Sequence, residues 1–95
     1  MPDPTRQVLA LLAEHAATGL DYVSIFIFLN TVPGGHYQET IGAEVLQAVL
    51  RAALTRGWIE AGPAEGPTPL SPELAIKPGG ARLHLTASGR EALAR

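Results

Sequence analysis

Residues 40–61, TIGAEVLQAVLRAALTRGWIEA, decide the fold, because the most regular helical pattern of the chain runs here directly into a strand. The polar residues of this helix form one narrow stripe, which contains Thr40, Glu44, Gln47, Arg51 and Thr55. Thr40 suits the N-cap position, and Gly57 suits the residue that ends a helix. We therefore predict a helix over residues 40–56 that is apolar around most of its circumference and buried on several sides.

Two short strands flank a long loop after this helix. Residues 58–61, WIEA, read as a strand, and residues 82–86, RLHLT, alternate apolar and polar side chains as a half-buried strand does. Residues 62–81 between them hold five of the eight prolines and four of the ten glycines, which is the composition of a loop. We expect the two strands to pair as an antiparallel hairpin against the helices.

Capping residues predict further helices at both ends of the chain. Asp3 and Pro4 are typical of a helix start, so we expect a helix over residues 4–17 that Gly19 follows in a left-handed conformation. Near the other end, Thr86 or Ser88 can cap a last helix over residues 87–95.

Residues 21–30, DYVSIFIFLN, are unusually apolar and fit two structures. A continuous apolar run suits either a strand buried on both faces or a buried helix. The preceding Asp21 and the following NTVPGG favour a helix over residues 22–30. One stripe of so short a helix cannot bury all of its large side chains. The surplus is therefore expected to form a partner surface together with the apolar flank of the helix over residues 40–56. The candidates for this interface are Tyr22, Phe26 and Phe28.

Bulk composition indicates one globular domain over residues 1–95. The chain is 46% apolar and 17% charged, has no cysteine and carries a formal charge of −2. Its longest run of large apolar residues, Ile25 to Leu29, is too short for a membrane span, which needs about 20 residues. The first residues show no signal-peptide pattern. We expect a cytoplasmic protein with no membrane partner.

Two segments resemble the winged-helix domain of bacterial MarR- and PadR-type regulators. They are LRAALTRGWIE at residues 50–60, similar to the end of a recognition helix entering a wing strand, and LTASGREALAR at residues 85–95, similar to the junction of wing and last helix. The resemblance implies an α+β, mostly α fold, with a three-helix bundle, a two-stranded wing and a short C-terminal helix. It also implies a small dimeric transcriptional regulator that binds double-stranded DNA.

The residues that could contact DNA in such a fold lie on the third helix and the wing. Glutamine and arginine can read base edges, while basic side chains can contact phosphates. The candidates are Gln47, Arg51, Arg56, Lys77, Arg82 and His84. The seven Lys and Arg residues are nevertheless scattered along the chain, and nucleic-acid binders usually carry a basic patch. A winged-helix module for protein assembly, as a homodimer or with another protein, is therefore the alternative.

The sequence shows no pattern of a catalytic, cofactor or metal site. The three histidines fall on three different predicted elements, whereas metal ligands are usually closely spaced. The glycine pairs at residues 34–35 and 79–80 lack the lysine and hydroxyl residue of a phosphate-binding loop. We expect neither an enzyme nor a bound cofactor or metal ion.

Overall fold

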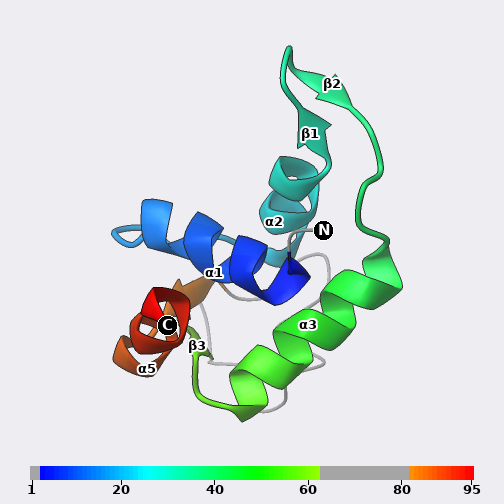
Figure 1. Cartoon of the computed structure of the whole chain (residues 1–95). Helices are drawn as coiled ribbons and strands as arrows, with labels where there is room; N and C mark the ends of the chain where they lie inside the picture. Colours follow the sequence, from blue (N-terminus) through cyan, green and yellow to red (C-terminus); the bar gives the residue numbers. More distant parts are fainter. Residues whose placement is uncertain (1–2, 63–81) are drawn as a thin grey trace.

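The computed structural model describes residues 3–62 and 82–95 of the chain. Within these ranges the protein is α+β and mostly helical, with two small antiparallel hairpins, which confirms the expected α+β, mostly α class. The helices are α1 (Pro4–Glu14), α2 (Tyr22–Leu29), α3 (Ala43–Thr55) and α5 (Ala87–Ala94) (Figure 1). The strands are β1 (Thr31–Val32), β2 (His36–Tyr37), β3 (Ile59–Ala61) and β4 (Leu83–Leu85). The expected loop over residues 62–81 lies outside the described residues, apart from Gly62.

Aspartate side chains begin the first two helices, as the capping pattern predicts. Oδ1 of Asp3 accepts a hydrogen bond from the Thr5 amide at 3.0 Å, and Oδ1 of Asp21 accepts one from the Ser24 amide at 2.9 Å. The apolar run that begins at residue 22 is therefore the helix α2 and not a strand.

The first helix ends at Glu14, earlier than the predicted residue 17. The chain turns instead, and the Gly19 amide donates to the His15 carbonyl at 2.8 Å with a Gly19 φ of 68°. This turn allows Leu20 to pair with Leu83 of β4, through hydrogen bonds of 3.1 Å and 2.7 Å between their backbones. The backbone pairing of Leu20 is the physical reason for the shorter helix.

The third helix begins later than predicted and lacks the expected threonine cap. Gly42 occupies the N-cap position of α3 and provides no side-chain hydrogen bond. Thr40 instead donates its hydroxyl to the Leu29 carbonyl at 2.8 Å, so it satisfies the end of α2 rather than the start of α3. At the other end Gly57 follows the helix with a φ of 75°, as expected of a terminating glycine.

The hairpin expected at the wing position is present as β3 and β4. They pair antiparallel with Ile59 opposite Leu85 and Glu60 opposite His84. Thr86 then caps α5 by accepting a hydrogen bond from the Gly89 amide at 3.0 Å, so Thr86 and not Ser88 is the cap.

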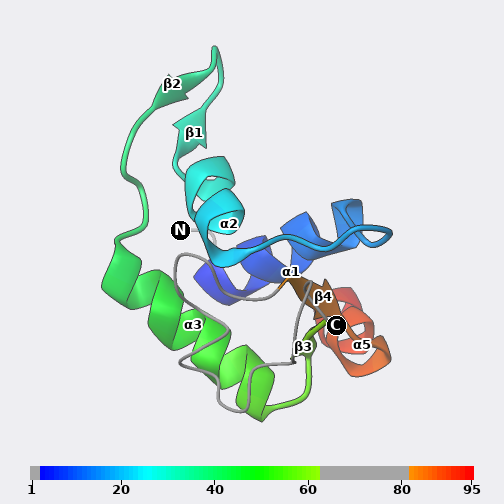
Figure 2. The same cartoon turned by 180° about the vertical axis from the view of Figure 1, so that it is seen from behind.

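A second hairpin, β1–β2, occupies a segment that the sequence analysis treats as the loop between two helices. Thr31 pairs with Tyr37 and Val32 with His36, around a turn that contains Gly34 and Gly35 at positive φ. We call residues 31–37 the finger. Seen from both sides, it projects from the end of α2 away from the rest of the fold (Figures 1 and 2).

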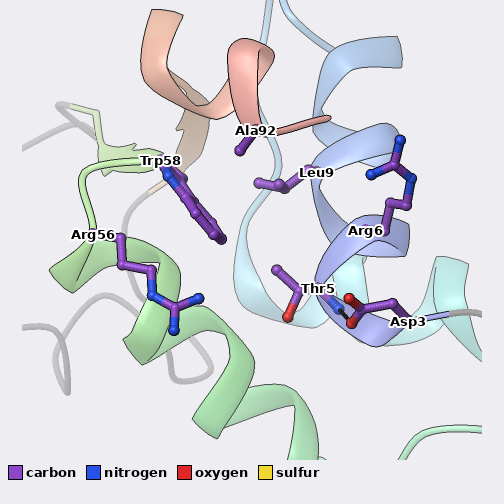
Figure 3. Close-up of a pocket in the computed structure, with 7 residues that line it drawn as sticks. All are labelled: Asp3, Thr5, Arg6, Leu9, Arg56, Trp58 and Ala92. Carbon is purple, nitrogen blue, oxygen red and sulfur yellow. Dashed lines mark hydrogen bonds between the residues drawn. The ribbon is translucent and has the colours of Figure 1, made fainter. Parts of the chain in front are cut away.

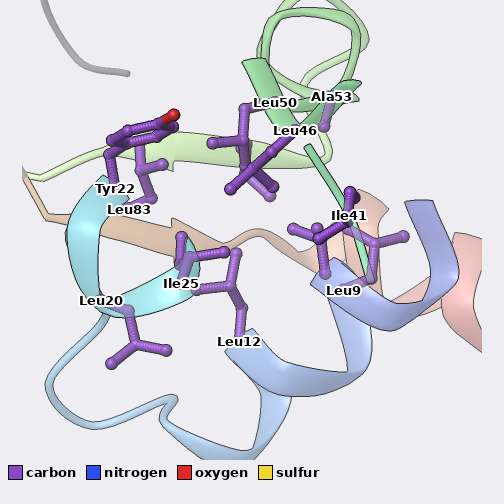
Figure 4. Close-up of a cluster of buried hydrophobic side chains, with 12 residues drawn as sticks. Leu9, Leu12, Leu20, Tyr22, Ile25, Ile41, Leu46, Leu50, Ala53 and Leu83 are labelled. Carbon is purple, nitrogen blue, oxygen red and sulfur yellow. The ribbon is translucent and has the colours of Figure 1, made fainter. Parts of the chain in front are cut away.

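The hydrophobic core lies around α1, which packs against α2, α3, α5 and β4. Large buried side chains from α1, α2, α3, β3 and β4 meet in one cluster, and Ala92 and Leu93 of α5 pack against it while partly buried (Figure 4). The fully or almost fully buried members include Val8, Leu9, Leu12, Ile25, Leu46, Leu50, Ile59 and Leu83. Their convergence fixes how α2 and α3 are held relative to each other.

The third helix is buried along only one side, which corrects the expectation of burial on several sides. Its buried residues are Leu46, Leu50 and Ala53, which share one stripe of the helix. Val45 and the alanines at positions 48 and 52 are exposed. These apolar side chains therefore contact solvent on the side of α3 opposite its buried stripe.

Candidate functional site

The outward face of α3 carries few groups that could contact DNA. Arg51 is exposed, together with Glu44 and Thr55, so the two charged side chains on this face are of opposite sign. Gln47 is only half exposed, and its Nε2 donates to the Tyr22 hydroxyl at 3.5 Å. Gln47 and Arg51, both proposed to contact base edges, therefore lie in different environments. Gln47 contacts α2, whereas Arg51 is exposed.

Arg56 lies at the end of α3 against an aromatic ring rather than beside Arg51. Its guanidinium carbon is 4.8 Å from the centre of the Trp58 ring, a cation–π geometry. Both residues line a small pocket of about 140 Å³ (Figure 3). Arg6 also lines this pocket but turns toward α5, donating to the carbonyls of Leu93 and Arg95 at 2.6 Å and 3.0 Å.

The basic candidates near β4 hold the turn between α1 and α2. Arg82 donates to the carbonyls of Thr18 and Gly19 at 3.4 Å and 3.2 Å. The His84 ring lies close to Gly19 and Gly62, because a Cβ atom on either glycine would come within 2.6 Å and 2.5 Å of it. Arg82 and His84 thus contact the turn between α1 and α2 and do not lie beside the candidates on α3. Lys77, the remaining candidate, lies outside the described residues.

The aromatic residues proposed from the sequence for a partner interface have three different environments. Tyr22 is 6% exposed and belongs to the core. Phe26 is half-buried between Tyr22 and Tyr37, with ring centres 6.4 Å and 6.5 Å away. Phe28 is 49% exposed, and its ring centre lies 5.3 Å from that of His15. Of the three, Phe28 offers the largest exposed area to a partner.

An apolar groove lies between the ends of three helices and includes Phe28. Its volume is about 630 Å³, within the range of about 300–1,000 Å³ typical of ligand pockets. It is lined by Pro4, Gln7, Phe28, Leu29, Thr40, Ile41, Gly42 and Val45. None of these side chains is charged, so the groove suits an uncharged, largely apolar occupant.

Large apolar residues are exposed on α2, on the finger and at the start of α3, and two of them, Phe28 and Val45, also line the groove. Among the described residues they are Val23 (38% exposed), Ile27 (50%), Phe28 (49%), Tyr37 (60%) and Val45 (49%). All five lie on α2, on the finger or in the first turn of α3. We call these five residues the apolar surface. The sequence pointed to Phe28 and to the apolar flank of the third helix, on which Val45 lies, but not to Tyr37, because it did not predict the finger.

The finger is attached to the fold through the completely buried Asn30. Its side-chain oxygen accepts hydrogen bonds from the amides of Thr40 and Ile41 at 2.7 Å and 2.8 Å, and its Nδ2 donates to the Phe26 carbonyl at 2.9 Å. The Asn30 carbonyl also accepts from the Gln38 amide at 2.7 Å. The two chain segments that enter and leave the finger are thereby joined at its base.

The described part of the chain shows no feature of a metal site or membrane span. No three His, Cys, Asp or Glu side chains come close enough together there to hold a metal ion. No helix in those ranges has the length and apolar character needed to cross a bilayer. Of the two pockets described above, the apolar groove is the larger. Comparison with protein families, curated proteins and solved structures finds no match to this chain.

Proposed function

We propose that this chain is a winged-helix module that assembles with protein through the apolar surface and the groove beside it. The order of elements supports the winged-helix arrangement, since three helices precede β3, and β4 returns antiparallel before a short last helix. The bridge from Leu20 to Leu83 extends β4 on the side opposite β3, so the link between α1 and α2 joins the small sheet.

The observation that carries the proposal is an apolar groove whose lining includes two exposed large apolar side chains, Phe28 and Val45. Single exposed apolar residues are common on soluble proteins, but a group of large ones beside an apolar groove is typical of interaction sites. Phe28 and Val45 belong to both the apolar surface and the groove lining. Burying these side chains against a partner would remove apolar area from water, at about 25 cal/mol per Å².

Charge also favours a protein partner over DNA. Affinity for duplex DNA comes largely from phosphate contacts by Lys and Arg. Here Arg82 contacts the carbonyls of Thr18 and Gly19, and Arg56 lies over Trp58. The outward face of α3 adds one acidic and one basic side chain, which together contribute no net charge.

A pair of substitutions tests whether the apolar surface is free for binding. We expect Phe28→Ser to cost about 1–2 kcal/mol in the free energy of unfolding, because about half of the side chain is already exposed to water. Ile25→Ser, on the buried side of the same helix, should cost more than about 3 kcal/mol. At concentrations too low for self-association, Phe28→Ser should also reduce binding of a fluorescent dye for apolar surfaces. Unfolding of the Phe28→Ser variant would show that the ring belongs to the core and would remove the proposal's main support.

A dimeric bacterial transcriptional regulator that binds DNA is the second candidate. One observation favours it: Arg51 in the C-terminal half of α3 and Arg56 at its C-cap are both exposed, on the helix that the winged-helix resemblance assigns to the major groove. Binding of random-sequence duplex DNA at low salt tests this candidate, with Arg51→Glu plus Arg56→Glu as the matched variant. The regulator requires binding that the double substitution abolishes, because non-specific phosphate attraction is strongest at low salt.

A further inference from the structure

The finger and the groove are adjoining features of opposite shape. The finger leaves α2 immediately after Asn30, and the chain returns from it to Thr40, where both Thr40 and Ile41 line the groove. The finger projects from the fold (Figure 1). The groove is a hollow of about 630 Å³ beside the base of the finger. A surface that combines a projection and a hollow can be complementary to a copy of itself.

We propose that the groove receives the finger of a second copy of this chain, in a reciprocal two-fold dimer. This inference rests on the proposed function and names the partner of the same surface. In a two-fold contact the same surface is used by both copies, so finger and groove of one copy meet groove and finger of the other. Because the two features adjoin on each chain, both contacts form within one continuous interface.

The side chains of the finger are suited to an uncharged apolar groove. Residues 31–37, TVPGGHY, contain no acidic residue and no Lys or Arg, and His36 is the only titratable group before Tyr37. The tip of Pro33, Gly34 and Gly35 is narrow, since two of its three residues have no side chain. Tyr37 is 60% exposed and provides the kind of aromatic anchor that often dominates binding energy.

The attachment of the finger lowers the entropic cost of docking. A segment that is already ordered before binding loses less conformational freedom in the complex. The hydrogen bonds of Asn30 to the amides of Thr40 and Ile41 fix the base of the finger in the free chain. Tyr37 is further held by its ring contact with Phe26 at 6.5 Å. The finger is thus held by the fold on both of its strands.

The absence of cysteine from the chain allows a direct cross-linking test of this arrangement. One variant carries His36→Cys in the finger, and a second, distinguished by a size tag, carries Val45→Cys in the groove lining. The two are mixed and oxidised, and disulfide-linked tagged–untagged pairs are measured. Gln7→Cys provides a second groove position, and Arg90→Cys on the exposed side of α5 is the matched control. Circular dichroism of each variant establishes that it is folded.

We expect His36→Cys to cross-link with either groove cysteine about tenfold or more faster than with the α5 control, because docking raises the effective concentration. Adding Phe28→Ser to both variants should reduce this rate to that of the control, because it alters both grooves of the reciprocal dimer. Equal rates for groove and control cysteines would overturn the finger-in-groove dimer. If the rates are equal while Phe28→Ser still folds and loses dye binding, the apolar surface serves a different protein. If Phe28→Ser also unfolds, the proposed function fails together with this inference.

Discussion

The side-chain oxygen of Asn30 accepts a hydrogen bond from the backbone amide of Ile41 at 2.8 Å, in a fully buried position. This contact joins the end of α2 to the segment that leads into α3, across the base of the finger. Ile41 is itself buried and lines the groove. One polar side chain therefore determines where both the finger and one wall of the groove lie.

Replacing Asn30 should destabilise the fold although no charge is lost. Asn30→Ala leaves the amides of Thr40 and Ile41 without their acceptor, and we expect a loss of about 2–4 kcal/mol in the free energy of unfolding. Urea unfolding measures this loss. Gln38→Ala, at an exposed neighbouring position, should change stability by less than about 0.5 kcal/mol. A loss for Asn30→Ala no larger than for Gln38→Ala would show that the buried contact does not hold the finger.

Replacing Gly89 by alanine should destabilise the protein, although alanine is usually preferred to glycine inside a helix. A Cβ atom there would collide with the carbonyl oxygen of Trp58 and would lie 2.6 Å from the Leu85 side chain. Alanine is favoured over glycine inside a helix by about 1 kcal/mol, yet we expect Gly89→Ala to cost about 1–3 kcal/mol by thermal unfolding. The neighbouring Ser88→Ala, which is exposed and does not cap α5, should be nearly neutral. Stabilisation by Gly89→Ala would contradict the close approach of α5 to β3.

The start of α3 offers a stabilising substitution. Gly42 is the N-cap and makes no side-chain hydrogen bond, its φ is −75°, and a Cβ atom there would meet nothing within 4 Å. Gly42→Ser supplies a capping hydroxyl and restricts the unfolded chain, so we expect a gain of about 0.5–1 kcal/mol in urea unfolding. The matched Gly57→Ser should instead lose stability, because Gly57 has a φ of 75° that serine rarely adopts. Equal effects at the two glycines would be inconsistent with these backbone conformations.

Acid should weaken the fold partly through Asp21. Hydrogen bonding from Ser24 lowers the pKa of the Asp21 carboxyl below its ordinary value of 3.8. Burial opposes this shift by raising the pKa, whereas the nearby charge of Arg82 lowers it further. The folded state thus favours the charged form, so Asp21 contributes stability above pH 3.8 that is lost as the pH falls through its folded pKa. Asp21→Asn retains a capping side chain without this titration. The difference in melting temperature between wild type and Asp21→Asn should shrink from pH 5 toward pH 2, and a constant difference would refute the assignment.

Helices and strands whose ends are set by residues adjacent in the sequence could be predicted. The caps Asp3 and Asp21 lie next to the helices they begin, and Gly57 directly follows the helix it ends. The alternation of residues 82–86 likewise sufficed to predict the strand β4, which pairs with β3. These patterns are local, so they are readable without knowledge of the tertiary fold.

Features that depend on contacts distant in sequence could not be predicted. The partners of Asn30 lie ten and eleven residues further on, and nothing in the residue itself indicates its burial. The strands of the finger have two residues each, too few for an alternating pattern. Composition also could not tell that Tyr22 is buried while Phe28 is half exposed, since this depends on how α2 is rotated against the core.

Sedimentation velocity of the unmodified chain, from micromolar to millimolar concentration, tests the central claim most directly. A reciprocal finger-in-groove dimer requires a shift from the mass of one chain to that of two as the concentration rises. Phe28→Ser should remain at the mass of one chain over the same range while retaining the wild-type circular dichroism spectrum. A wild-type chain that stays monomeric throughout, or a dimer that Phe28→Ser leaves intact, would contradict assembly of two copies through this surface.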